Sequence, residues 1–268
     1  MIGIRNPRQL QKMREAGALL HEVLERVRER IEPGATTRQL DQLAERLIRK
    51  GGAQPSFLNY DGYPASLCTS ADDQVVHGIP NETPLREGQI LSIDGGLILD
   101  GWQADSAFTV GVGRISTQAR ALIEATERSF YEGIAMAREG NRVSDISHAV
   151  QSYVERFGFQ PVRALCGHGI GKRLHEEPEV PNFGGPGRGV RLRAGMTLAV
   201  EPMIVTGDWP VHRLGDGWTM VTDDGGLCAH YEHTIAVAPE GSHPEILTLP
   251  GVTLAQMLAR AFSEGGAS

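Results

Sequence analysis

The chain carries an internal repeat, and this repeat constrains the fold more than any other feature of the sequence. Residues 85–94 read L-R-E-G-Q-I-L-S-I-D, and residues 192–201 read L-R-A-G-M-T-L-A-V-E, at a shift of 107 positions. Each segment is a turn followed by an apolar strand that ends on a carboxylate, Asp94 in the first copy and Glu201 in the second. The sequence therefore predicts two related halves, with a site between them that takes one acidic side chain from each.

Amphipathic helices precede the repeated strands. Asn6-Pro7 is a helix-initiating pair, and apolar residues then recur at spacings of three and four up to Ile31. A second helix begins at Thr36 or Thr37 and ends at Gly51-Gly52, and a shift of 106 positions aligns it with a later segment. We expect a single catalytic domain over residues 1–268, with duplicated halves at approximately 7–115 and 116–240.

Composition and charge exclude several classes of protein. The 268 residues are 40% hydrophobic and 22% charged, which is ordinary for a globular chain, and the formal net charge of -7 argues against a nucleic-acid surface. Three cysteines without a C-x-x-C pair form neither a disulfide framework nor a thiolate zinc site. Residues 1–10 are too polar for a signal peptide, so we expect a cytoplasmic protein that does not bind membranes.

Two aspartates flank a predicted hairpin. Asp100-Gly101 is a strong two-residue turn signal, and this turn would place Asp105 opposite Gly96, one same-face step from Asp94. Such diagonal neighbours have Cα atoms about 7–8 Å apart. Their carboxylates could share two metal ions roughly 3.5–4 Å apart. The alternative is two solvated acids on an exposed sheet face.

Further candidate ligands follow in the second half. His168 lies in C-G-H-G-I-G, where the glycines permit close backbone packing, and His175 follows in H-E-E-P. Glu201 ends an apolar run, and Glu232 lies in the strand-like Y-E-H-T-I-A-V-A, where an unpaired buried carboxylate is costly. Each residue alone is compatible with a structural histidine or a salt bridge. Together, four carboxylates and one imidazole favour two divalent ions such as Mn, Fe, Co or Zn.

The chain contains, in this order, the motifs I-D-G-G, A-D-S, C-G-H-G-I-G, H-E-E-P, E-P-M, D-G-W and Y-E-H-T. Their order resembles that of type I methionine aminopeptidases over nearly the whole chain. The resemblance implies an α/β (α+β) fold of the pita-bread type, in which two pseudo-symmetric halves share a curved, mainly antiparallel sheet covered by helices. It also implies metal ligands, which would be Asp94, Asp105, His168, Glu201 and Glu232.

By the same resemblance, the catalytic residues would be His77, from V-V-H-G-I-P, together with His175 and Glu201. The substrate-binding set would be Phe57, Tyr60, Tyr63, Cys68, His77, Leu174, His175 and Trp218. Three positions depart from the pattern of bacterial members, because Phe57 stands where Cys is frequent, Leu174 where Phe is common and His230 where Gln is usual.

The resemblance implies removal of the initiator methionine from nascent polypeptides when the second residue is small, by hydrolysis with two divalent ions per chain (Co, Mn, Fe or Zn). The expected partners are nascent N-termini beginning with Met, the ribosome being a further candidate, and the chain is expected to be a monomer without direct nucleic-acid binding. One alternative is a Pro-specific peptidase of the same fold, although the extra N-terminal domain of those enzymes is not expected in 268 residues. Another is a non-catalytic binding module, against which the complete ligand set argues.

Overall fold

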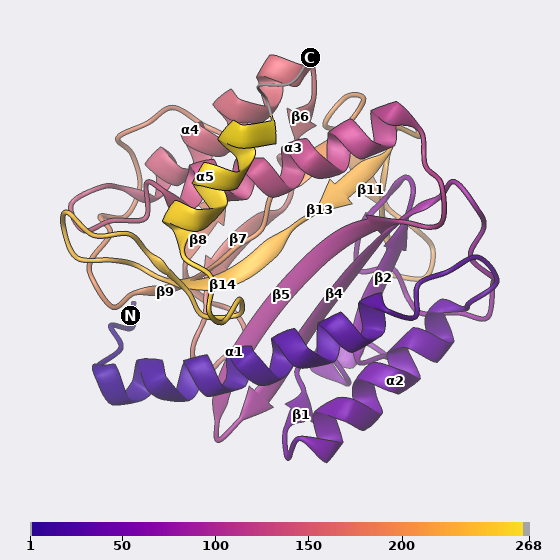
Figure 1. Cartoon of the computed structure of the whole chain (residues 1–268), viewed down its shortest axis with the longest axis horizontal. Coiled ribbons are helices and arrows are strands. Elements are labelled where there is room, and N and C mark those ends of the chain that lie inside the picture. Colours follow the sequence, from indigo (N-terminus) through magenta and orange to yellow (C-terminus); the bar gives the residue numbers. More distant parts are fainter. Residues whose placement is uncertain (1, 265–268) are drawn as a thin grey trace.

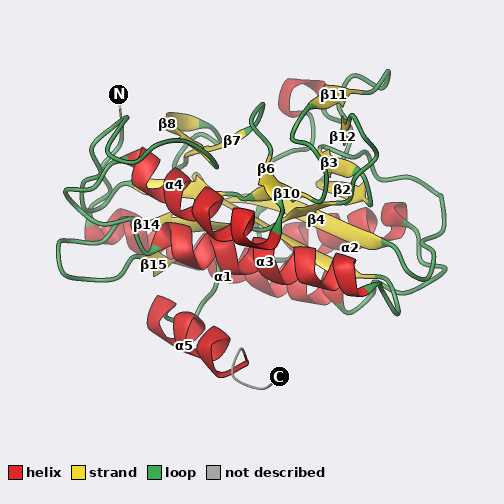
Figure 2. Ribbon diagram, turned by 90° about the horizontal axis from the view of Figure 1, so that it is seen from above, coloured by secondary structure: helices red, strands yellow, loops and turns green. Residues whose placement is uncertain are grey.

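One large sheet organises the molecule, and helices cover one of its faces (Figures 1 and 2). The computed structural model describes residues 2–264. The elements before residue 115 are α1 (Pro7–Arg28), α2 (Thr37–Lys50), β1 (Gln54–Pro55), the 3-10 turn η1 (Tyr60–Gly62), β2 (Leu67–Ala71), β3 (Gln74–Val76), β4 (Ile90–Leu99) and β5 (Trp102–Gly111).

The later elements begin with a second helix pair and then supply most of the short strands. They are α3 (Thr117–Ile134), α4 (Val143–Val154), the 3-10 turn η2 (Glu155–Phe157), β6 (Gln160–Pro161), β7 (Cys166–Gly169), β8 (Glu176–Pro181), β9 (Thr197–Val200), β10 (Met203–Val205), β11 (Val211–Arg213), β12 (Met220–Thr222), β13 (Cys228–His230), β14 (Glu232–Ala236), β15 (Glu245–Ile246) and α5 (Leu254–Glu264). Across the described residues, no helix combines the length and apolarity needed to cross a membrane.

The main sheet has nine strands within the described residues. Its order is β1-β4-β5-β14-β9-β7-β8, with β2 also on β4 and β15 also on β14. Every strand pair in it is antiparallel. Two small sheets, β13-β10-β6 and β11-β12-β3, extend from it. Helices α1 to α4 lie on one face, and β3, β11 and β12 lie beyond the other (Figure 2). The predicted fold class is confirmed.

The first two helices begin where the sequence predicts. Asn6 and Gln9 form a capping box at the start of α1, and Thr36 forms one at the start of α2, which decides between the two candidate threonines. Helix α1 ends at Arg28, before the predicted end at Ile31. Arg30 and Ile31 instead bond back three residues as turns. In a continued helix, Pro33 would have no N–H for the Glu29 carbonyl, and its ring would clash with that carbonyl.

Helix α1 packs tightly on the hairpin that carries the two aspartates. Its buried residues Leu20 and Leu24 join one hydrophobic core with Ile93 and Leu97 of β4. Gly95 permits this approach, since a Cβ there would lie 2.8 Å from Leu67 and 3.2 Å from Leu24. Because successive side chains of a strand point to opposite faces, the neighbouring residues of β4 face away from the helices.

The main sheet consists of one part built from β1, β2, β4 and β5 and another built from β14, β9, β7, β8 and β15. The two parts meet where β5 pairs with β14. Only two residue pairs form this junction, Ser106 with His233 and Ala107 with Glu232. Beyond each end of this two-pair junction, a threonine hydroxyl bonds the backbone groups that no backbone partner meets. The Thr234 hydroxyl bonds both the N–H and the carbonyl of Asp105, and the Thr109 hydroxyl does the same for His230. The backbone groups at the ends of this short junction are therefore satisfied by side chains.

Candidate metal centre and substrate pocket

All of the predicted site residues line one pocket of about 280 Å³. The pocket lies on the sheet face away from α1. Its lining is Phe57, Tyr60, Asp61, Tyr63, Cys68, His77, Asp94, Asp105, His168, Leu174, His175, Glu201, Trp218 and Glu232. Only Asp61 in this set is absent from the sequence prediction. The D-G pair that follows Tyr60 signals a turn there, but a turn signal does not show which cavity the turn borders.

The hairpin holds its two aspartates in the predicted register. Asp100 and Gly101 both have positive φ, 51° and 75°, as a type I′ turn requires. Asp105 consequently pairs with Gly96, while Asp94 pairs with Ala107. Both carboxyl groups enter the pocket. The geometry deduced from the turn residues is confirmed.

His168 is placed by the glycines on either side of it. A Cβ at Gly167 would lie 2.4 Å from the Ala199 carbonyl, and one at Gly169 would lie 2.1 Å from the Glu177 carbonyl. Strand β7 can therefore sit between β9 and β8 only with glycine at both positions. The His168 Nδ1 lies 2.9 Å from the Gly169 carbonyl and donates to it, which leaves the Nε2 lone pair free for a ligand.

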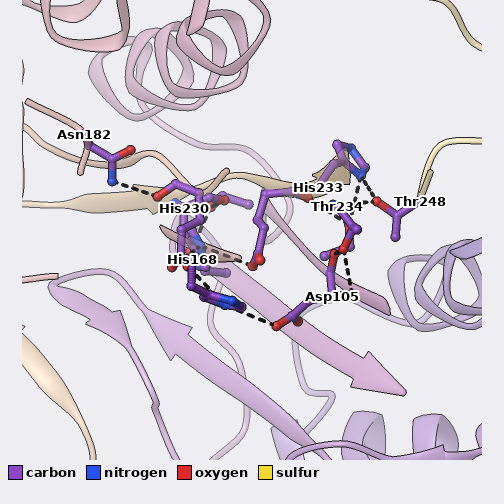
Figure 3. A network of polar contacts seen from close by, with 12 residues as sticks. Asp105, His168, Asn182, His230, His233, Thr234 and Thr248 are labelled. Carbon is purple, nitrogen blue, oxygen red and sulfur yellow. Dashed lines mark hydrogen bonds and ion pairs between the residues drawn. The ribbon is translucent and has the colours of Figure 1, made fainter. Parts of the chain in front are cut away.

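The His168 Nε2 points into a cluster of acids (Figure 3). It lies 3.9 Å from Asp105 Oδ2 and 3.7 Å from Glu201 Oε1. Two sets of three potential donor atoms occur in this cluster, each within 4.8 Å: Asp105 with His168 and Glu232, and Glu201 with His230 and Glu232. Asp94 lines the same pocket but belongs to neither set. The imidazole of His230 was not among the predicted ligands.

The acids of the cluster are buried without enough partners. Asp94 Oδ1, Asp105 Oδ1 and Glu232 Oε1 have no hydrogen bond. Burial raises the pKa of Asp94 to about 7, and burial with neighbouring carboxylates raises the pKa of Asp105 and Glu232 well above their usual range. Among residues 2–264, their ion-pair contacts involve only the imidazoles of His168 and His230. Buried carboxylates of this kind are suited to divalent cations, so the donor set fits a metal centre.

The imidazoles of the pocket are held in the uncharged form. Burial lowers the pKa of His168 and His77 to about 4 and that of His230 to about 3. Neutral imidazole is the form that binds metal ions. His77 follows β3 with a φ of 61°, an unusual backbone angle for histidine that turns its ring toward Trp218.

His175 lies between the acids and the pocket entrance. Its ring meets that of His168 edge-on, with 4.4 Å between the centroids. The Tyr60 hydroxyl lies 2.7 Å from the His175 Nδ1, so this contact can fix which ring nitrogen carries the proton. Tyr60 belongs to the exposed turn η1, whereas His175 precedes β8, and the contact joins these two segments across the pocket mouth.

Most of the remaining lining is apolar. Phe57, Tyr63, Cys68 and Leu174 form one hydrophobic cluster, with Trp218 packed against it. The rings of Tyr63 and Trp218 are edge-to-face at 5.1 Å, and the Tyr63 hydroxyl lies 2.9 Å from two backbone carbonyls. A slot with aromatic walls thus adjoins the acid cluster.

The fold and the buried donor set together define a metal-dependent enzyme. A profile of metallopeptidase family M24 matches residues 11–239, and the chain belongs to this family. Membership implies the use of divalent metal in catalysis.

Relatives of this chain carry a more specific name. It is 53% identical over 249 residues to the methionine aminopeptidase of Clostridium perfringens, covering 93% of this chain and 99% of that protein. It is 48% identical over 241 residues to methionine aminopeptidase 1 of Bacillus subtilis, covering 90% and 97%. The solved methionine aminopeptidase of Rickettsia prowazekii has a TM-score of 0.91 at 40% identity, covering 93% of this chain and all of that one. The predicted resemblance is confirmed.

The fold alone extends to more distant proteins. Prolidase from Pyrococcus furiosus has a TM-score of 0.73 at 17% identity, and this chain covers 66% of it.

Proposed function

We propose that this chain is a metalloaminopeptidase that removes the initiator methionine from nascent polypeptides whose second residue is small. One observation carries the proposal: a single pocket joins a cluster of buried carboxylates and imidazoles to an apolar slot. The cluster supplies the hydrolytic chemistry, and the slot accepts one apolar side chain. The relatives named methionine aminopeptidase support the same reading.

The centre would hold two divalent ions, of Co, Mn, Fe or Zn. Their ligands would be Asp94, Asp105, His168, Glu201 and Glu232. Support comes from the unpartnered oxygens of three of these acids and from the free Nε2 of His168. Four carboxylates balance the charge of two dications. When bound, such ions lower the pKa of a water molecule and polarise the scissile carbonyl.

Glu201 would act as the general base. Its side chain is 14% exposed, compared with 5% for Asp105 and 3% for Glu232, so it is the most accessible of these three carboxylates from the pocket. It accepts the proton of the attacking water and passes it to the leaving amine.

Two histidines would bind the reacting peptide. The Tyr60 hydroxyl, 2.7 Å from His175 Nδ1, would donate to this nitrogen and so keep the proton on Nε2, where the N–H would stabilise the oxyanion as it forms. His77, on the Trp218 side of the pocket, contacts the peptide on the leaving side. The α-amine of the substrate lies near Asp94, which limits cleavage to the first residue.

Selectivity for methionine would come from the shape of the slot. An unbranched, polarizable thioether can enter between Tyr63, Cys68 and Trp218, whereas a branched side chain cannot. Phe57 makes one wall fuller, and Leu174 makes another looser than the Phe common in the family. Discrimination of one methylene by size is worth only about 1–3 kcal/mol, so norleucine should also be accepted.

We further propose that the enzyme works as a monomer in the cytoplasm, because its substrates, the new N-termini, emerge there. The ribosome is a candidate partner for the same reason. All of the proposed ligands come from a single chain, so the site does not need a second copy.

The test is a comparison of kcat/KM for Met-Ala, norleucine-Ala, Leu-Ala, Met-Lys and Ala-Pro peptides with metal saturating, and Glu201→Gln as the inactive control. We expect Met-Ala and norleucine-Ala to be cut far faster than the others. Equal rates for Leu-Ala or Met-Lys would indicate a general aminopeptidase, and preference for Ala-Pro would indicate a Pro-specific peptidase. No turnover of any peptide would indicate a binding module.

A further inference from the structure

His230 is a second imidazole in the acid cluster, and the proposed five-residue ligand set leaves it without a role. It is the last residue of β13, it is 1% exposed, and its Nε2 has no hydrogen-bond partner. An unpartnered buried nitrogen is costly unless a ligand meets it. The Thr109 hydroxyl bonds both the backbone N–H and the backbone carbonyl of His230, and this holds the backbone of His230 in place.

The distances from His230 Nε2 to the nearest carboxylate oxygens fit joint coordination of one metal ion better than hydrogen bonding. His230 Nε2 lies 3.8 Å from Glu201 Oε2 and 3.7 Å from Glu232 Oε2. These values exceed the roughly 2.7–3.2 Å of an N–H···O bond. Two donor atoms each about 2.0–2.2 Å from one ion lie up to about 4 Å apart. His168 has the same spacing, 3.7–3.9 Å, to its two acids.

Glu201 lies between the two imidazoles. Its Oε1 faces His168 and its Oε2 faces His230. Glu232 belongs to both sets of three donors, one with each histidine. The cluster therefore contains one imidazole, His168 or His230, for each of two neighbouring sets of potential metal donors (Figure 3).

The strand register places His230 at a position equivalent to that of Asp105. Asp105 pairs with Gly96 in the main sheet, and His230 pairs with Met203 in the small sheet of β13, β10 and β6. Met203 corresponds to Gly96 at the 107-residue shift of the internal repeat. The hydroxyl of Thr234 in β14 bonds the backbone N–H and carbonyl of Asp105, and the hydroxyl of Thr109 in β5 bonds those of His230. His230, which occupies the position equivalent to that of the proposed ligand Asp105, is thus itself a potential metal ligand.

We propose that His230 Nε2 is a direct metal ligand, which together with Glu201 and Glu232 binds one of the two ions. The inference rests on the proposed two-ion centre. An added imidazole favours borderline ions such as Co²⁺ and Zn²⁺ over the harder Mn²⁺. The centre should therefore prefer Co²⁺ to Mn²⁺ more strongly with histidine at this position than with glutamine.

The test uses the whole chain after treatment with a chelator. Titration calorimetry with Co²⁺ alone and Mn²⁺ alone compares wild type, His230→Gln and His233→Gln. His233 is a matched control, because it is also buried and is next to Glu232, but its ring bonds Ser106 and Thr248 on the other face of the sheet (Figure 3). Circular dichroism and melting temperature verify that each variant is folded.

We expect His230→Gln to lose at least about tenfold in Co²⁺ affinity at one of two sites, with a smaller loss for Mn²⁺ and no change for His233→Gln. A crystal structure of the wild-type Co²⁺ complex gives a second measurement that needs no variant, and Nε2 should lie about 2.0–2.2 Å from an ion. Two bound ions with His230 beyond 3 Å of both, or unchanged affinity in folded His230→Gln, would overturn the role of His230 alone. Failure of the wild type to bind two ions would overturn the two-ion centre as well.

Discussion

Strand β7 has no room for a side chain beside His168, and Gly169→Ala tests how much the site depends on this. A Cβ at residue 169 would lie 2.1 Å from the carbonyl oxygen of Glu177 and 2.6 Å from its carbon. Contacts of Cβ atoms below 3.0 Å are essentially never observed, and the neighbour is backbone that cannot rotate away. To move this contact from 2.1 Å to the 3.0 Å limit, strands β7 and β8 must therefore separate by about 0.9 Å at this point.

This separation should affect catalysis more than folding. The Gly169 carbonyl accepts the His168 Nδ1 proton, so a shift of residue 169 also turns the ring that supplies Nε2. A misplacement of about 1 Å costs about 100-fold in rate, and overpacking costs about 1–3 kcal/mol of stability. We expect kcat/KM for a Met-Ala peptide, with Co²⁺ saturating, to fall about 100-fold.

The matched control is Gly185→Ala. A Cβ at residue 185 meets nothing within 4 Å, so activity and the free energy of unfolding in urea should stay close to wild type. If Gly169→Ala kept kcat/KM within threefold and unfolded at the same urea concentration, the argument from close packing around His168 would be refuted.

Three further outcomes follow from the site. Glu201→Gln should lower kcat about 10²- to 10⁴-fold at saturating substrate while the protein stays folded; steady-state kinetics within tenfold of wild type would contradict its role as base. His175→Ala should lower kcat more than it raises KM, because oxyanion contacts strengthen in the transition state; a change in KM alone would count against this. Because burial raises the pKa of Asp94 from 3.8 to about 7, the folded metal-free chain holds a proton that the unfolded chain has lost. In chelator, the melting temperature of the wild type relative to that of Asp94→Asn should therefore fall as pH rises from about 4 to 7, a comparison that cancels the opposite effect of the buried histidines, whose pKa values burial lowers. Co²⁺ should restore the melting temperature of the wild type at pH 7.5, and a flat difference between the two proteins in chelator would disprove the burial argument.

The sequence predicted the acidic hairpin in detail because local rules determine it. Asp100-Gly101 supplies the two positive φ values of a type I′ turn, and the turn then fixes every pair along β4 and β5. The predicted pocket set was also recovered as one cavity, since the family resemblance carried long-range information that spacing alone does not.

What the sequence did not predict depends on contacts between distant segments. Asp61 enters the pocket through a left-handed turn whose position relative to the sheet no local pattern encodes. In the sequence, His230 is recognisable only as a departure from the family pattern. Its place in the cluster depends on two pairings, of β13 with β10 and of β14 with β9, which bring Glu201 beside His230 and Glu232.

The junction between β5 and β14 sets a condition on the biosynthesis of the chain itself. The Ser106 hydroxyl binds the Glu232 carbonyl across 126 residues of sequence, and contacts this distant form slowly and late. Until residue 232 has been made, β5 has no partner on the side that β14 will occupy, and an unpaired strand edge invites association with other chains. A copy still in synthesis can carry Asp94 and Asp105, yet it lacks the carboxylate of Glu232 that completes the cluster. Each molecule therefore becomes able to process new chains only after residue 232 of its own chain has been made.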